Sequence, residues 1–425
     1  MLRCSVSSGL EEVVVTARAA FSKRSWPYVL ATAVPWLVCA GQRSMRRLAA
    51  LGGLRRSVSA YYRFLSDGKW RLPKLYASLF ALIVRVFEVR ELTVVLDDTL
   101  CPKWGRSIYG TSDFFDHVRR PRAGYIWGHN WIVLAVVVPA GTATWVALPF
   151  WIGLYRSKKR CPPEQFRTRH QLAAGALTLV RALFPGPIRL LADGAYANDS
   201  LIAPAQEIGI KLITRIRSDA VLRKPKPARR SAHRRGRKLK FGARLPKLPA
   251  LARSTAALRS ERVNIYGKSV ELLVRDFEAY WPALRRVVKI VITRDPRRPR
   301  RVAYLMSTDL SLGAVAVVEA FAQRWTIEQL FSVAKQQMGL DTAEVRKPTA
   351  VVRHAALCMA LITWTEVWAH RTHAHLRRRP FAAKLAALRE NTITETVFSS
   401  GPRTRGSRRI AKGLASIFNT ATSAA

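Results

Sequence analysis

The sequence is poor in acidic residues. Its 425 residues include 72 Lys and Arg against only 27 Asp and Glu, which leaves a formal net charge of +45. A positive excess of this size indicates a polyanionic partner, most often nucleic acid, because each phosphate that is neutralised releases condensed counterions. The charge balance therefore favours a nucleic-acid-binding protein, with a membrane surface as the second candidate.

Cysteine is scarce as well. The five cysteines lie at positions 4, 39, 101, 161 and 358, and no two of them have a CxxC spacing. This pattern argues against both a cysteine zinc site and a disulfide framework, and it fits a reducing compartment. The first residues, MLRCSVSSGLEEVVV, lack the basic-then-apolar order of a signal peptide. We therefore expect a cytoplasmic protein.

Long apolar runs are also few, and the candidate for a membrane span is residues 131–155. This segment reads WIVLAVVVPAGTATWVALPFWIGLY, and its PAGTAT cluster separates two β-branched runs of strand length. That pattern is typical of a buried β-hairpin. The sequence therefore predicts a hairpin at this position and no contact with a membrane.

The order of the predicted elements indicates an α/β protein with a mixed sheet. Strands are expected at 92–96, 188–192 and 211–216, and a helix at 163–184. The basic, Pro-rich segment 223–253 and several further strands follow. We divide the chain into a helical domain that is a candidate for DNA binding (1–88), a first α/β part (89–216), a basic β-rich insertion (217–311), a second part with further helices (312–372) and a basic C-terminal tail (373–425).

The role of the first domain has two interpretations. Basic and aromatic residues surround a break at Gly52 and Gly53, which fits a helix-turn-helix-like pairing on DNA. A plain helical bundle with a solvated basic face fits the same pattern.

Aspartates follow two of the apolar strands. Asp97 and Asp98 follow the first strand, and Asp193 follows the second. Open α/β sheets place their active sites at the carboxyl ends of strands, although an Asp there also commonly begins a turn or caps a helix. Adjacent residues of a strand point to opposite sides, so at least one of Asp97 and Asp98 faces the core or a cleft. A carboxylate in that position needs a metal, a cation or a proton.

The third candidate acid lies on a predicted helix. In FAQRWTIEQLFSVAKQQMGL, residues 321–340, a uniform 100° per residue places Glu328 about 40° and Lys335 about 20° from Arg324. The three charges thus form a strip beside the apolar face. An Arg and a Glu four residues apart commonly form only a weak surface ion pair. In a cleft, the same strip would suit a metal-binding Glu328 with cations that receive phosphates.

These residues carry a resemblance to the DDE transposases of bacterial insertion sequences. Arg324, Glu328 and Lys335 match the Tyr-x2-Arg-x3-Glu-x6-Lys signature of that family, with Phe321 in the place of the Tyr. Asp98, followed by Thr, resembles the first acid, with Asp97 as the alternative, and Asp193 resembles the second. The resemblance covers about residues 90–370 and implies an RNase H-like mixed sheet flanked by helices, with a β-rich insertion and an N-terminal helical domain. It implies that residues 89–216 and 312–372 form the two parts of a catalytic domain, in a bacterial protein that is associated with the nucleoid when it is bound to DNA.

The resemblance also implies the chemistry. Asp98, Asp193 and Glu328 would hold two Mg²⁺ ions, for which Mn²⁺ can substitute, and Arg324 and Lys335 would bind DNA phosphates. Two such ions can serve both ends of an in-line displacement at phosphorus, and hard carboxylate oxygens suit Mg²⁺. The expected partners are double-stranded DNA, namely the terminal inverted repeats of the element and the target, and a second copy of the chain in a synaptic complex.

Two alternatives remain open from the sequence. One is a non-catalytic DNA-binding protein derived from a transposase. The other is a metal-dependent nuclease of the same fold that does not carry out transposition.

Overall fold

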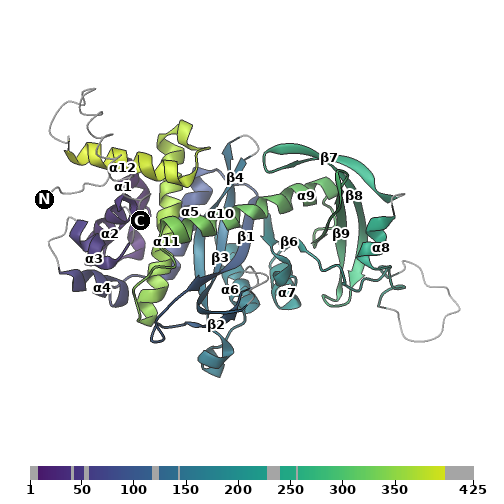
Figure 1. The fold of residues 1–425 in the computed structure, drawn as a ribbon, viewed down its shortest axis with the longest axis horizontal. Helices are drawn as coiled ribbons and strands as arrows, with labels where there is room; N and C mark the ends of the chain where they lie inside the picture. Colours follow the sequence, from purple (N-terminus) through teal and green to yellow (C-terminus); the bar gives the residue numbers. More distant parts are fainter. Residues whose placement is uncertain are drawn as a thin grey trace.

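The computed structural model describes residues 8–39, 43–51, 57–116, 124–141, 144–226, 240–254 and 257–397. The break predicted at Gly52 and Gly53 and the centre of the basic segment 223–253 lie outside these residues. Figure 1 shows an elongated molecule with a helical part at one end, a sheet in the middle and the predicted insertion at the other end.

The N-terminal part is helical, as predicted. Its helices are α1 (Ser8–Val15), α2 (Trp26–Val38), α3 (Met45–Leu51), α4 (Val58–Ser66) and α5 (Leu72–Val86). Side-chain hydrogen bonds to backbone oxygens tie these helices to the second half of the chain. The Trp36 indole donates to Met338 O, and the Arg353 guanidinium donates to Leu65 O and Trp70 O. The N-terminal helices therefore pack as part of one continuous core.

The central sheet begins with an antiparallel meander. Its strands are β1 (Leu92–Pro102), β2 (Ser112–Phe115), β3 (Tyr125–Gly141) and β4 (Thr144–Tyr155). Strands β3 and β4 pair from Asn130–Tyr155 to Gly141–Thr144, so the hairpin predicted from residues 131–155 is confirmed. Strand β1 is longer than expected, which places Asp97 and Asp98 within the strand instead of after it.

Two parallel strands extend the sheet on the other side of β1. The chain continues through α6 (Arg169–Leu183), β5 (Ile188–Ala192), α7 (Asp199–Glu207) and β6 (Ile210–Arg215). Helix α6 starts six residues later than predicted, because Thr168 and Gln171 form a reciprocal capping box at its N-terminus. Strand β5 lies parallel between β1 and β6.

The insertion prolongs this sheet. It comprises α8 (Leu248–Arg253), β7 (Arg259–Ile265), β8 (Lys268–Trp281), β9 (Arg286–Asp295) and β10 (Arg298–Ser307), and β10 pairs with β6. Within the described residues, the strands form one ten-stranded sheet in the order β2-β3-β1-β5-β6-β10-β9-β8-β7, with β4 paired to β3. The predicted α/β class with a mixed sheet and a β-rich insertion is confirmed.

Helices complete the fold. Helix α9 (Ala314–Ala322) leads through the 3₁₀ turn Gln323–Trp325 into α10 (Thr326–Ser332) and the π-helical segment Val333–Gln337. The chain then forms α11 (Pro348–Thr372) and α12 (Phe381–Val397). Helix α12 falls within the predicted basic C-terminal tail, so part of that tail is helical. It packs on α2, where Arg389 donates to Leu37 O.

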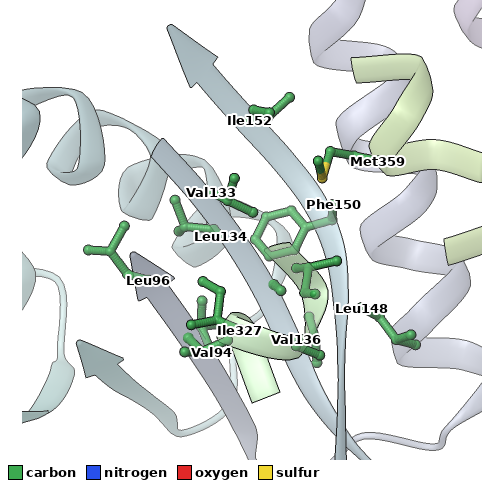
Figure 2. Packing of buried hydrophobic residues seen from close by; sticks show 14 of the residues in the cluster. Val94, Leu96, Val133, Leu134, Val136, Leu148, Phe150, Ile152, Ile327 and Met359 are labelled. Atoms are coloured by element: carbon green, nitrogen blue, oxygen red, sulfur yellow. The ribbon is translucent and has the colours of Figure 1, made fainter. Parts of the chain in front are cut away.

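Apolar side chains from distant segments meet at the centre of the molecule. Figure 2 shows residues of β1, β3 and β4 packed with Ile327 of α10 and Met359 of α11. Among the described helices, α11 is long and apolar enough to cross a membrane by length and composition, but 89% of its most apolar window is buried inside the protein. Burial of this kind is what a core helix shows.

Candidate catalytic site

Strands β1 and β5 separate at their carboxyl ends, and three aspartates follow the last residues that pair. Pairing between β1 and β5 ends at Leu96 and Ala192. Asp97 and Asp98 come next on β1, where they still pair with β3 but no longer with β5. Asp193 comes next after β5, at the start of a 3₁₀ turn. The predicted Asp residues of the two strands therefore lie at one edge of the parallel part of the sheet, where such folds bind ligands.

Asp97 faces the helical segment that carries Glu328. Its Oδ2 atom lies 3.0 Å from Arg324 Nη1, and its Oδ1 atom accepts the backbone N–H of Asp98. Burial raises the pKa of Asp97 to about 7, with smaller raising contributions from the charges of Asp98 and Asp193, although the Asp98 N–H and Arg324 act in the opposite direction. Asp97 thus combines desolvation, which raises its pKa, with an ion pair to the buried guanidinium group of Arg324.

Asp98 faces a different set of partners. Asn130 Nδ2 and Arg169 Nη1 each donate to Asp98 Oδ2 at 3.0 Å, and the Tyr196 hydroxyl donates to Oδ1 at 3.0 Å. Burial, together with the charge of Asp98, raises the pKa of Tyr196 well above its usual range, so the phenol stays protonated as a donor. The two adjacent carboxylates therefore bind separate partners, as the alternation of a strand requires.

Tyr196 connects Asp98 to Asp193. The residue belongs to the 3₁₀ turn that follows Asp193, and its backbone N–H donates to Asp193 O at 2.9 Å. The hydroxyl of Thr214 on β6 also donates to Asp193 O. The turn holds the backbone of Asp193 against β6 and brings the Tyr196 hydroxyl to Asp98.

Arg324 connects Asp97 to Glu328. Its side chain is only 10% exposed, and Nη2 lies 2.6 Å from Glu328 Oε1 while Nη1 binds Asp97. The predicted proximity of Arg324 and Glu328 is therefore present, but both ends of the guanidinium are used inside the protein. One buried guanidinium group thus links Glu328 to Asp97.

Lys335 lies in the π-helical segment that follows α10. The uniform angle that predicted its alignment with Arg324 and Glu328 therefore does not hold there. Among the described residues it forms no ion pair within 4.0 Å, and its charge favours the thiolate of buried Cys101. The structure therefore places Lys335 near the end of β1 that lies beyond the acids.

The chemistry of these residues suits a hard divalent cation, although their present arrangement is not a compact cage. Within the described part of the chain, no three His, Cys, Asp or Glu side chains are close enough together to hold a metal ion. Arg169 and Arg324 are the cations that face the carboxylates instead. Asn130 Oδ1, beside Asp98, is buried without a hydrogen-bond partner. The site offers hard oxygen ligands at a partly buried edge, and these are the ligands that Mg²⁺ prefers.

Asp97 predicts a pH dependence of stability. Its folded-state pKa of about 7 lies above the ordinary 3.8, so protons bind more tightly to the folded state and this contribution to stability is lost as pH rises through about 7. In metal-free protein, the wild type should lose about 2 kcal/mol relative to Asp97→Asn between pH 5 and pH 8. Urea unfolding in EDTA at both pH values measures the difference. The raised pKa of Asp97 would be contradicted if the unfolding free energy of the wild type, relative to that of Asp97→Asn, stayed constant or increased between pH 5 and pH 8.

Three residues of the site were not predicted from the sequence, namely Asn130, Arg169 and Tyr196. Tyr196 follows Asp193 by three residues in DGAY, and Arg169 follows the capping residue Thr168, but neither spacing predicts a partner on β1. Asn130 is a polar residue within an apolar strand. Because a buried amide needs hydrogen-bond partners, this position could have been predicted from the sequence to belong to a site. Of the predicted residues, the structure brings together Asp98 and the turn after Asp193, and it brings together Glu328 and Arg324. Among the described ion pairs, none joins Lys335 to either group.

Comparisons with known proteins identify the family to which the sequence is similar. Residues 18–269 match the model of a family described as DDE superfamily endonuclease, a range that includes all three aspartates and ends before Glu328. The chain is 23% identical over 181 residues to a probable transposase for insertion sequence element IS701 from Microchaete diplosiphon. That match covers 42% of this chain and 45% of the relative, so the chain spans less than half of the relative's length.

Proposed function

The chain belongs to the DDE superfamily of endonucleases, and from this premise we propose that it is a transposase that cuts and joins DNA at the ends of an insertion sequence. The net charge of +45 supports DNA as the partner. Joining two ends requires that both are held together, so we expect at least two copies of the chain in a synaptic complex with the terminal inverted repeats and the target.

We assign the catalytic acids as Asp98, Asp193 and Glu328. The observation that carries this choice is the difference between the two arginines. Arg169, the cation on Asp98, is 42% exposed, so it can leave and let Asp98 bind another cation. Arg324, the cation on Asp97, is 10% exposed and is shared with Glu328, so its removal would leave the 18% exposed carboxylate of Asp97 without its ion-pair partner. Asp97 is therefore a positioning residue that fixes Arg324, and Arg324 in turn fixes Glu328.

Enzymes of this superfamily use divalent metals, and two Mg²⁺ ions, when bound, would align the nucleophile and neutralise charge on the leaving oxygen. The chain's own residues would prepare the site for this chemistry. Asn130 and Tyr196 hold the Asp98 carboxylate in one orientation. Because Arg324 is used inside the protein, we propose that only Lys335 of the two predicted phosphate ligands contacts DNA.

Arg169 should control how strongly the site takes up a divalent ion. Replacing Arg169 by Gln removes a charge that competes for Asp98 Oδ2, so we expect the affinity for Mn²⁺ without DNA to rise about tenfold. Electron paramagnetic resonance of free Mn²⁺ measures this binding directly. The matched control is Arg167→Gln, because Arg167 donates only to backbone oxygens in the same loop. Unchanged affinity in Arg169→Gln would mean that Asp98 does not bind the ion.

The function itself is tested with purified chain and DNA that carries the sequences flanking its gene. We expect breaks at the ends of the element in Mg²⁺ and none in EDTA, mapped at nucleotide resolution. Binding to the ends without breaks would instead support the non-catalytic alternative. Breaks scattered over unrelated DNA would support a nuclease that does not carry out transposition.

A further inference from the structure

Arg215 is the last residue of β6, the strand that lies beside the turn after Asp193. The parallel register of β5 and β6 ends at Ala192 and Thr214, so Asp193 and Arg215 are the next residues along the two segments. A Cβ atom added to Gly194, which follows Asp193, would lie 3.4 Å from Arg215 Cβ. Arg215 therefore lies at the sheet edge that carries the second candidate acid.

The Arg215 side chain reaches the helical segment that carries Glu328. Its guanidinium carbon lies 5.7 Å from the centroid of the Phe321 ring, and the guanidinium carbon of Arg324 lies 5.8 Å from the same centroid. Arg324 in turn donates to Glu328 Oε1 at 2.6 Å. A continuous series of contacts thus joins the Asp193 turn to Glu328, and Arg215 is the member of this series beside Asp193.

The guanidinium group of Arg215 is held in place but is not used inside the protein. The residue is exposed, and among the described residues none forms a hydrogen bond or an ion pair with its side chain. Arg324 differs, because both of its ends bind carboxylates. The Phe321 ring restricts the Arg215 guanidinium without taking up its N–H donors. Such a cation can receive an anion with little further loss of side-chain freedom.

We propose that Arg215 binds the DNA phosphate on which the acids act. This inference rests on the proposed function, because it adds a ligand for the substrate to the same site. A guanidinium group binds phosphate oxygens through two parallel N–H donors, and Arg215 carries such a pair at the edge where Asp193 lies. Arg215 would then supply the planar cation that Arg324, which is bound inside the protein, does not offer to DNA.

The test measures how far the contribution of Arg215 to DNA affinity depends on one phosphate. One probe is a fluorescein-labelled duplex that carries an element end and its flank. The other is the same duplex with a neutral methylphosphonate at the boundary between element and flank in each strand. Fluorescence anisotropy in EDTA measures both affinities. Arg215→Gln should weaken binding of the charged probe about fivefold and leave the neutral probe within about 1.5-fold of wild type.

Arg217→Gln is the matched control. Arg217 lies two residues further along the chain and pairs with Asp219, with 2.8 Å between Arg217 Nη2 and Asp219 Oδ2. Its replacement removes the same charge, but the ratio of the two affinities should stay as in the wild type. Arg215→Lys retains the charge without the planar pair of donors, so it should restore part of the preference for the charged probe.

Each outcome supports or overturns the proposal. Equal losses on both probes in Arg215→Gln, or no loss on either, would overturn it, because a purely structural role cannot distinguish the two probes. If the wild type cuts no DNA but Arg215→Gln loses affinity only for the charged probe, the proposed function fails and the phosphate contact stands. If the wild type cuts element ends and Arg215→Gln binds both probes as the wild type does, the assignment of Arg215 alone fails.

Discussion

Replacing Glu328 by Gln is expected to reduce DNA cleavage by roughly a thousandfold while DNA binding stays close to wild type. The amide keeps the shape of the side chain but loses the charge that a divalent ion requires. It also loses the ion pair with Arg324, which remains bound to Asp97 and so stays in place. Single-turnover cleavage of element ends, measured beside gel-shift binding of the same DNA, checks both parts of the expectation.

A neighbouring carboxylate provides the control. Glu319 lies on α9, the helix that precedes α10 and Glu328, and it accepts a hydrogen bond from the backbone N–H of Asn264 in the insertion. Glu319→Gln removes the same charge away from the acids, so its cleavage rate should remain within about threefold of wild type. Equal losses in the two variants would show that the effect of Glu328→Gln is structural and would remove Glu328 from the catalytic set.

The second large effect is expected at Asp98. Asp98→Asn should also reduce cleavage by roughly a thousandfold, whereas Asp97→Asn should reduce it only about 10- to 100-fold, as is typical for residues that support a metal ligand. The physical reason is that the Asp98 carboxylate can exchange Arg169 for a divalent ion, while Asp97 remains bound to Arg324. Cleavage rates of the two variants over a range of Mn²⁺ concentrations distinguish the roles.

The cleavage activity that high Mn²⁺ restores is a second way to distinguish Asp97→Asn from Asp98→Asn. A positioning residue acts through Glu328, so high Mn²⁺ should restore much of the activity of Asp97→Asn and little of that of Asp98→Asn. The reverse pattern, with Asp97→Asn inactive and Asp98→Asn nearly active, would exchange the two assignments. In that case the first acid would be the one that faces Arg324.

Much of the fold could be predicted from the sequence because its patterns are local. The hairpin at 131–155 follows from two β-branched runs around a turn, and the position of Asp193 follows from a short apolar strand. The later start of α6 was also encoded locally, in the capping box of Thr168 and Gln171. These features depend on neighbouring residues, which a single sequence displays.

The parts of the site that the sequence could not supply depend on contacts between distant segments. Arg169 reaches Asp98 across 71 positions, and Arg324 reaches Asp97 across 227. The uniform helix geometry also failed at Lys335, because a π-helical segment changes the angle per residue there. The exposed fraction of the arginine partner, 42% for Arg169 and 10% for Arg324, distinguishes Asp98 from Asp97 as the proposed metal ligand. A single sequence does not show these exposures.

The most direct measurement is the anomalous scattering of Mn²⁺ in crystals of the chain bound to a DNA end. The account predicts two peaks about 4 Å apart, ligated by Asp98, Asp193 and Glu328, with Arg169 withdrawn from Asp98. Ions bound elsewhere, or no ions at these acids while Arg169 still pairs with Asp98 in the presence of DNA, would contradict it.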